Sequence, residues 1–101
     1  MKIRRSRKKP TTVYAVTYYA RFKLSGEIQE NTQLLGLYYS RTVAVQDLIA
    51  MLNREYNAGV NETEEDLAAW MDRYRKKGME MNGIQCEWRI EEVNIDDSNK
   101  L

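Results

Sequence analysis

The sequence contains no histidine and only one cysteine among its 101 residues. Without histidine, the chain lacks the commonest general base and every Ser-His or Cys-His pair used in nucleophilic catalysis. Cys86 alone excludes an intramolecular disulfide, and it excludes a structural zinc site, which needs four ligands drawn mainly from cysteine and histidine. We therefore expect a reducing, cytoplasmic compartment and no metal.

Glycine-rich phosphate loops and long apolar runs are also absent. The five glycines are scattered along the chain, and the longest near-apolar run, residues 34–39, is too short to span a bilayer. The basic N-terminus is not followed by the apolar segment of a secretory signal. Cys86 lies in an alternating apolar stretch, which is typical of a small buried side chain rather than a nucleophile. The sequence thus predicts a soluble, non-enzymatic protein without a cofactor or a membrane partner.

Charged residues are distributed unevenly along the chain. Residues 1–23 contain eight basic side chains and no acid, whereas residues 24–101 contain eight basic and fifteen acidic ones, so the net charge of +1 is the sum of +8 and −7. The first ten residues, MKIRRSRKKP, have no apolar periodicity and end in a proline. We expect a flexible basic arm at 1–10, a single α+β domain at 11–96 and a frayed polar tail at 97–101.

The first half of the domain has the two-residue period of strands. Residues 12–24 alternate, which predicts a long strand with Tyr14, Val16 and Tyr18 on its buried face. SGE at 25–27 indicates a turn, and residues 27–33 are either an outer hairpin or a loop. A second strand is expected at 34–40, where Gly36 indicates a bulge or a close approach by another backbone.

The period then changes to that of helices. Apolar residues from Val45 to Tyr56 predict one amphipathic helix, capped by Ser40 or Thr42 and ending before Gly59. A second helix is predicted around Leu67, Trp70, Met71 and Tyr74. We expect Asn61 with Glu64 to cap it and Gly78 to end it, with four basic residues in its last turns: Arg73, Arg75, Lys76 and Lys77.

The chain returns to a strand at 83–95, with a bulge expected at Glu91 and Glu92 because Val93 and Ile95 fall out of phase. The order β-β-α-α-β predicts an α+β fold: a mainly antiparallel three-stranded sheet with two helices on one face. If the last strand pairs with the second, the sheet is wholly antiparallel; if it pairs with the first, we expect that pairing to be parallel. The predicted core is Tyr14, Val16, Tyr18, Phe22, Leu37, Leu48, Ile49, Leu52, Leu67, Trp70, Met71, Trp88 and Ile90.

The acidic body indicates a binding function. A folded surface of this charge fits a basic groove on a protein that handles nucleic acid, because charge complementarity governs encounter and partner choice. Small size, missing catalytic residues and segregated charge are typical of accessory proteins of phages and mobile elements, including inhibitors of host defence nucleases. The candidate protein-binding residues are Glu62, Glu64, Glu65, Asp66, Glu87, Glu91 and Glu92.

Nucleic-acid binding is the alternative. Each lysine or arginine that meets a phosphate releases counterions, and an exposed aromatic ring on an open sheet stacks on unpaired bases. The candidate residues come from the basic arm and from the uncovered face of the first strand: Arg4, Arg5, Arg7, Lys8, Lys9, Tyr19, Arg21 and Lys23.

Overall fold

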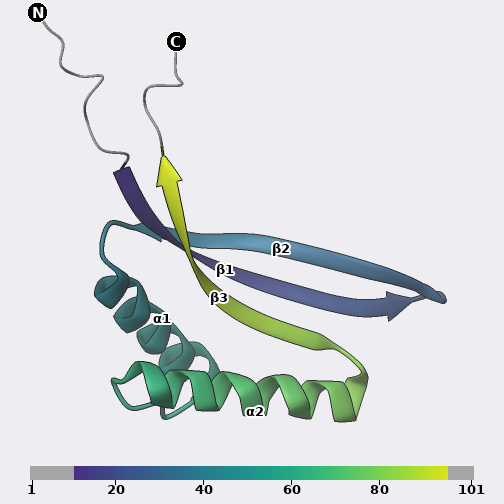
Figure 1. Cartoon of the computed structure of the whole chain (residues 1–101). Helices are drawn as coiled ribbons and strands as arrows, with labels where there is room; N and C mark the ends of the chain where they lie inside the picture. Colours follow the sequence, from purple (N-terminus) through teal and green to yellow (C-terminus); the bar gives the residue numbers. More distant parts are fainter. Residues whose placement is uncertain (1–10, 96–101) are drawn as a thin grey trace, which may run out of the picture.

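The computed structural model describes residues 11–95, so the arm expected at 1–10 and the tail expected at 97–101 lie outside the described residues. The predicted element order is confirmed (Figure 1). Two strands come first, β1 (Thr11–Leu24) and β2 (Glu27–Tyr38). Two helices follow, α1 (Arg41–Tyr56) and α2 (Glu64–Asn82), before the last strand, β3 (Gln85–Ile95).

A tight two-residue turn joins β1 to β2. Ser25 and Gly26 have φ values of 53° and 83°, the positive values that a type I′ hairpin turn needs at both central positions. Residues 27–33 are part of β2 and pair with β1, so the outer hairpin is the correct alternative for this stretch. The hairpin therefore extends as a long, twisted ribbon (Figure 1).

The strands are arranged in the order β2-β1-β3, and both pairings are antiparallel. The expectation that a last strand beside the first would be parallel is wrong. The two helices in series carry the chain from the start of β1 to its far end, where Gln85 lies opposite Arg21. β3 then runs back along β1 in the opposite direction, which makes β1 the central strand.

The bulge expected in β3 is also wrong. β3 pairs with β1 in an unbroken register from Gln85 to Ile95, so Glu91, Val93 and Ile95 share one face while Glu92 shares the other with Ile90. The irregularity is in β2, where the partners of β1 skip from Gly36 to Leu34. This confirms the bulge predicted near Gly36.

Gly36 has a packing role as well. A Cβ on this residue would lie 2.9 Å from the ring of Tyr38, which covers the glycine. The close approach is therefore made by a side chain rather than by a second backbone.

Both helices begin at hydroxyl caps. The Ser40 hydroxyl accepts a hydrogen bond from the Val43 amide at 3.3 Å, and the Thr63 hydroxyl accepts one from the Asp66 amide at 3.1 Å. Thr63 rather than Asn61 therefore caps α2. α1 ends at Tyr56, and its C-cap is Asn57, in a left-handed conformation with φ 53°, rather than Gly59.

α2 does not end at Gly78 but continues to Asn82, and Gly83 in a left-handed conformation is its C-cap. The last turn closes as the Ile84 amide donates to the Gly78 carbonyl, so the chain folds back against Gly78. A Cβ on Gly78 would lie 2.9 Å from the Ile84 carbonyl oxygen. This glycine is thus required by close packing, and the four basic residues expected in the last turns lie further from the C-terminus.

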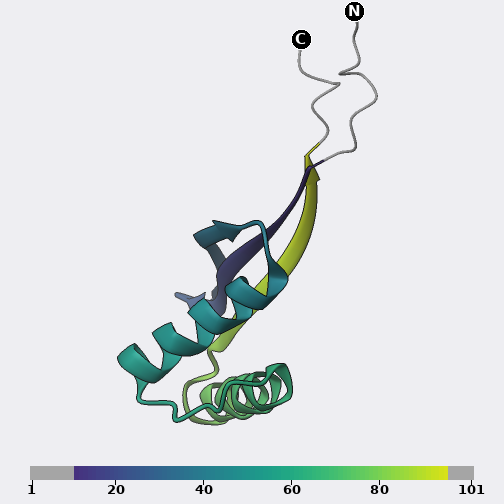
Figure 2. The same cartoon turned by 90° about the vertical axis from the view of Figure 1, so that its left-hand side faces the viewer.

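Both helices cover the same face of the sheet, as predicted (Figure 2). Val16 and Trp88 from the sheet meet α1, α2 and the loop between them in one buried cluster, whose other members are Ala44, Val45, Leu48, Ile49, Leu52, Val60 and Leu67. Among residues 11–95, no helix is long and apolar enough to cross a membrane.

The core differs from the prediction at several positions. Leu37 is 58% exposed, because it lies opposite Ala15 on the face that the helices do not cover. Phe22 is half-buried and lies outside the central cluster, because it is near the hairpin tip. Val13 and Ala15, which were not in the predicted core, are buried on the uncovered face because the strands on both sides of β1 shield these small side chains.

Candidate binding surfaces

The face of the sheet opposite the helices, called the open face below, is defined by the register of the three strands. Alternate residues of each strand project from it. They are Thr11, Val13, Ala15, Thr17, Tyr19, Arg21 and Lys23 of β1; Ile28, Glu30, Thr32, Leu34 and Leu37 of β2; and Gln85, Glu87, Arg89, Glu91, Val93 and Ile95 of β3.

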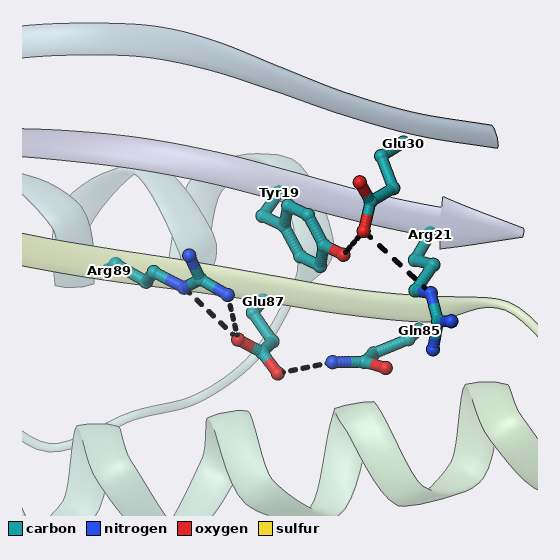
Figure 3. Close-up of polar contacts among 6 residues, drawn as sticks. All are labelled: Tyr19, Arg21, Glu30, Gln85, Glu87 and Arg89. Carbon is teal, nitrogen blue, oxygen red and sulfur yellow. Dashed lines mark hydrogen bonds and ion pairs between the residues drawn. The ribbon is translucent and has the colours of Figure 1, made fainter.

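A polar network occupies the half of the open face nearer the hairpin tip (Figure 3). The Tyr19 hydroxyl donates a hydrogen bond to Glu30 at 2.7 Å, and the Arg21 guanidinium lies 3.8 Å from the same carboxylate. The Arg89 guanidinium stacks over the Tyr19 ring, 4.5 Å from its centroid. Three strands are thus joined by side chains across β1.

Glu87 completes this network. Its carboxylate accepts two hydrogen bonds from Arg89, at 3.1 and 2.9 Å, and one from Gln85 at 2.6 Å. The Arg89 contact is the largest cause that lowers the pKa of the Glu87 carboxyl, because it stabilises the charged form. Two carboxylates and two guanidinium groups therefore neutralise one another in this half of the face.

These contacts bear on the candidate nucleic-acid residues. Tyr19, Arg21 and Lys23 project from the open face, as the strand alternation predicts. However, one face of the Tyr19 ring is occupied by Arg89, and Arg21 is close to Glu30. The other five candidates, Arg4, Arg5, Arg7, Lys8 and Lys9, lie outside the described residues.

The other half of the open face is apolar. Leu34 and Leu37 of β2 are 56% and 58% exposed, and Val93 and Ile95 of β3 are 39% and 38% exposed. Between them lie the buried side chains of Val13 and Ala15, so an apolar band runs diagonally across all three strands. The band is defined by these residues: Val13, Ala15, Leu34, Leu37, Val93 and Ile95. The signal in the sequence was the phase change at Val93, which indicates a change of face and not a bulge.

The candidate acidic residues are divided between two surfaces. Four of them, Glu62, Glu64, Glu65 and Asp66, surround the start of α2, where Glu64 forms an ion pair with Arg41. Glu64 is the largest cause that raises the pKa of Arg41, and Glu92, which lies opposite Tyr14 of β1, projects from the face that the helices cover. Glu87 and Glu91 lie on the open face. The structure thus brings five of the seven carboxylates to the helix side.

Aromatic rings fill the space between the helices and the sheet. Trp70 and Tyr74 of α2 stack with their centroids 4.9 Å apart, and Trp88 of β3 lies 5.3 Å from both Tyr74 and Tyr56. Such contacts add to the energy of burial, and the residues come from α1, α2 and β3. The cluster is therefore explained as packing.

Cys86 lies beside this cluster. It is half-buried, and its sulfur accepts a hydrogen bond from the Tyr18 hydroxyl at 3.1 Å. Burial is the largest cause that raises the pKa of Tyr18, so the phenol stays protonated and remains a donor. Within residues 11–95, no group of three or more cysteine, aspartate or glutamate side chains is placed to hold a metal ion.

A groove of about 600 Å³ lies between α1 and β2. Its walls combine aromatic and aliphatic side chains with the charged groups Asp47, Arg54 and Glu55. Arg54 pairs with Glu55 at 3.4 Å, and burial, followed by the nearby Asp47 carboxylate, raises the pKa of Tyr38.

Comparison with known proteins adds no functional assignment, so the surfaces above are the observations on which a function is inferred. No family model matches the chain, and neither a curated protein nor a solved structure matches it.

Proposed function

We propose that this protein is a non-enzymatic binding protein that contacts a basic surface of another protein through the carboxylates of its helix side. The distribution of charge is the observation that supports this proposal. Residues 11–95 contain nine basic and thirteen acidic side chains, for a net charge of −4. The open face contains three of each sign, so the whole negative excess lies off that face.

The start of α2 is the densest part of this acidic surface. Within the described part of the chain, Glu62, Glu65 and Asp66 form no ion pair, whereas Glu64 pairs with Arg41. Carboxylates at this end of a helix are favoured by the helix dipole, which holds them in place without a cation. They keep their charge available for a partner.

The partner that this surface fits is a protein with a basic groove, such as one that normally holds nucleic acid. An acidic protein seated in such a groove excludes the nucleic acid and acts as a stoichiometric inhibitor. In its most specific form, the proposal is an accessory protein of phage or mobile-element type that inhibits a host defence nuclease in the cytoplasm. Charge complementarity and small size support this form.

Nucleic-acid binding through the open face is the weaker candidate. A stacking platform needs free aromatic faces and unneutralised cations, but Arg89 covers Tyr19 and two carboxylates balance Arg21 and Arg89.

A pull-down from host lysate, with and without nuclease treatment, tests the proposal. We expect a protein partner that stays bound after nuclease treatment, and that also binds a variant lacking residues 1–9. Recovery of nucleic acid alone, or loss of all binding when residues 1–9 are deleted, would instead favour the nucleic-acid alternative.

A further inference from the structure

We propose that the open face packs against the open face of a second copy of this chain, so that the protein is a face-to-face dimer. This goes beyond the proposed function, because the dimer contact uses the surface opposite the helices and leaves the acidic start of α2 outward.

The apolar band is the first observation behind this proposal. Along β3, Trp88 and Ile90 face the helices, while Val93 and Ile95 face the other way in the same unbroken register. Leu34 and Leu37 on the opposite edge strand extend the exposed apolar surface across β1. A one-sided sheet would have polar residues at these positions, because antiparallel sheets with one solvated face alternate apolar and polar side chains.

Charge favours a second copy over a different partner. The open face has three basic and three acidic side chains, Arg21, Lys23, Arg89, Glu30, Glu87 and Glu91, while the rest of the described chain has a net charge of −4. Two copies repel each other least when they meet through a neutral surface, because the acidic helix side has the same sign on both copies. The open face is the neutral surface, and its mixed signs are complementary to themselves under twofold symmetry.

The area of the open face is large enough for a specific dimer only if the whole face is buried in the contact. Eleven residues of β1, Thr11 to Arg21, pair with β3. At about 3.3 Å per residue and about 4.8 Å per strand, three strands project roughly 500 Å² per copy, or about 1,000 Å² for two. Specific interfaces begin near this area, so the dimer is expected to be weak and to depend on concentration.

Sedimentation velocity over a concentration series tests this inference on the full chain. We expect the parent protein to shift from a mass of 11.9 kDa toward twice that value as concentration rises. Leu37→Glu on β2 and Val93→Glu on β3 should each shift the midpoint of this transition to at least tenfold higher concentration. The matched control is Met81→Glu on α2, at a side chain that is 69% exposed, and it should leave the transition unchanged.

Leu37→Thr and Val93→Thr provide a second pair of variants, because threonine also favours strands. Far-UV circular dichroism checks that each variant folds. A parent that stays monomeric at every concentration overturns the proposal. A dimer that Val93→Glu dissolves and Leu37→Glu does not also overturns it, because that result indicates pairing through the β3 edge. Added salt should leave the apolar dimer largely intact, whereas binding through the acidic surface should weaken.

Discussion

Val93 of β3 lies directly opposite Val13 of β1, on the face of the sheet that neither helix covers. Two residues further along β1, Ala15 lies opposite Leu37 of β2 on the same face. Apolar side chains therefore reach both surfaces of the sheet, one under the helices and one toward solvent. Within residues 11–95, the open face is neutral, and the negative excess lies on the rest of the surface.

The helix side of the sheet holds the core, and Leu48 and Trp70 test that assignment. Leu48 is 2% exposed, so Leu48→Ala should lower the free energy of unfolding by about 2 to 5 kcal/mol through lost burial and the cavity left behind. Trp70 is half-buried, and Trp70→Ala should cost about 3 kcal/mol. Leu37→Ala, measured at protein concentrations at which the chain is monomeric, is the control, because its 58% exposed side chain should then change stability by about 0.5 kcal/mol or less. Chemical denaturation that ranks Leu37 with Leu48 would contradict this division of the core.

Replacing Gly78 by alanine should not give the gain in stability that alanine usually gives over glycine within a helix. An added Cβ would meet the Ile84 carbonyl at 2.9 Å, so we expect Gly78→Ala to destabilise the protein by about 1 to 3 kcal/mol. Ala69→Gly at an exposed position of the same helix reports helix propensity alone and should cost about 1 kcal/mol. A gain in thermal stability for Gly78→Ala would show that the last turn of α2 does not pack as described.

The Glu87–Arg89 contact predicts a pH dependence. The pKa of Glu87 is lowered below 4.5 mainly by the Arg89 hydrogen bonds, so its charged form is favoured in the folded state. The contact therefore stabilises the fold above pH 4.5, and this contribution is lost as the pH falls through the lower folded value. NMR titration of the Glu87 carboxyl carbon should show the shift. Arg89→Gln should return the pKa toward its usual value, and Arg54→Gln on α1 should not.

The basic N-terminal segment, although outside the described residues, gives a prediction from sequence alone. Replacing Arg4, Arg5, Arg7, Lys8 and Lys9 by alanine should change the association rate more than the dissociation rate: association becomes slower with nucleic acid and faster with a protein partner whose contact surface is basic. The effect should fade as salt rises, because exposed charges act over about 8 Å at physiological ionic strength. Binding kinetics at two salt concentrations measure this. A loss that persists undiminished in high salt would indicate a specific contact made by the segment.

Periodicity was sufficient to predict the element order and the packing of both helices on one face. The Val16, Leu48 and Leu67 positions follow the two-residue and 3.6-residue patterns that a single buried face imposes. The pattern gave wrong predictions where the second face of the sheet is also apolar. The position of Val93 then predicted a bulge, and that of Leu37 predicted a core residue.

The ends of the helices were harder to predict from the sequence than the helices themselves. The sequence predicted Gly78 as the stop of the second helix, but the helix ends at Gly83, and the position of the Ile84 carbonyl shows that Gly78 is a packing requirement. Thr63 and Asn61 are both good caps, and the choice depends on where the preceding loop places the first turn.

The division of the acidic residues between two faces likewise needed the register of β3. Glu91 and Glu92 are adjacent in sequence but project from opposite sides of the sheet, and Glu87 is neutralised by Arg89. Composition indicates how much charge the chain has, whereas the fold determines which carboxylates share a surface.

The most direct test of the acidic binding surface is the association rate of a purified protein partner with two variants of equal charge change. Glu62→Gln/Glu65→Gln alters the start of α2, and Glu27→Gln/Glu80→Gln alters exposed carboxylates at the hairpin tip and near the end of α2. We predict that the first variant associates roughly tenfold more slowly than the parent at low salt, with little change for the second. Equal rates for the two variants would contradict the assignment of partner binding to the start of α2.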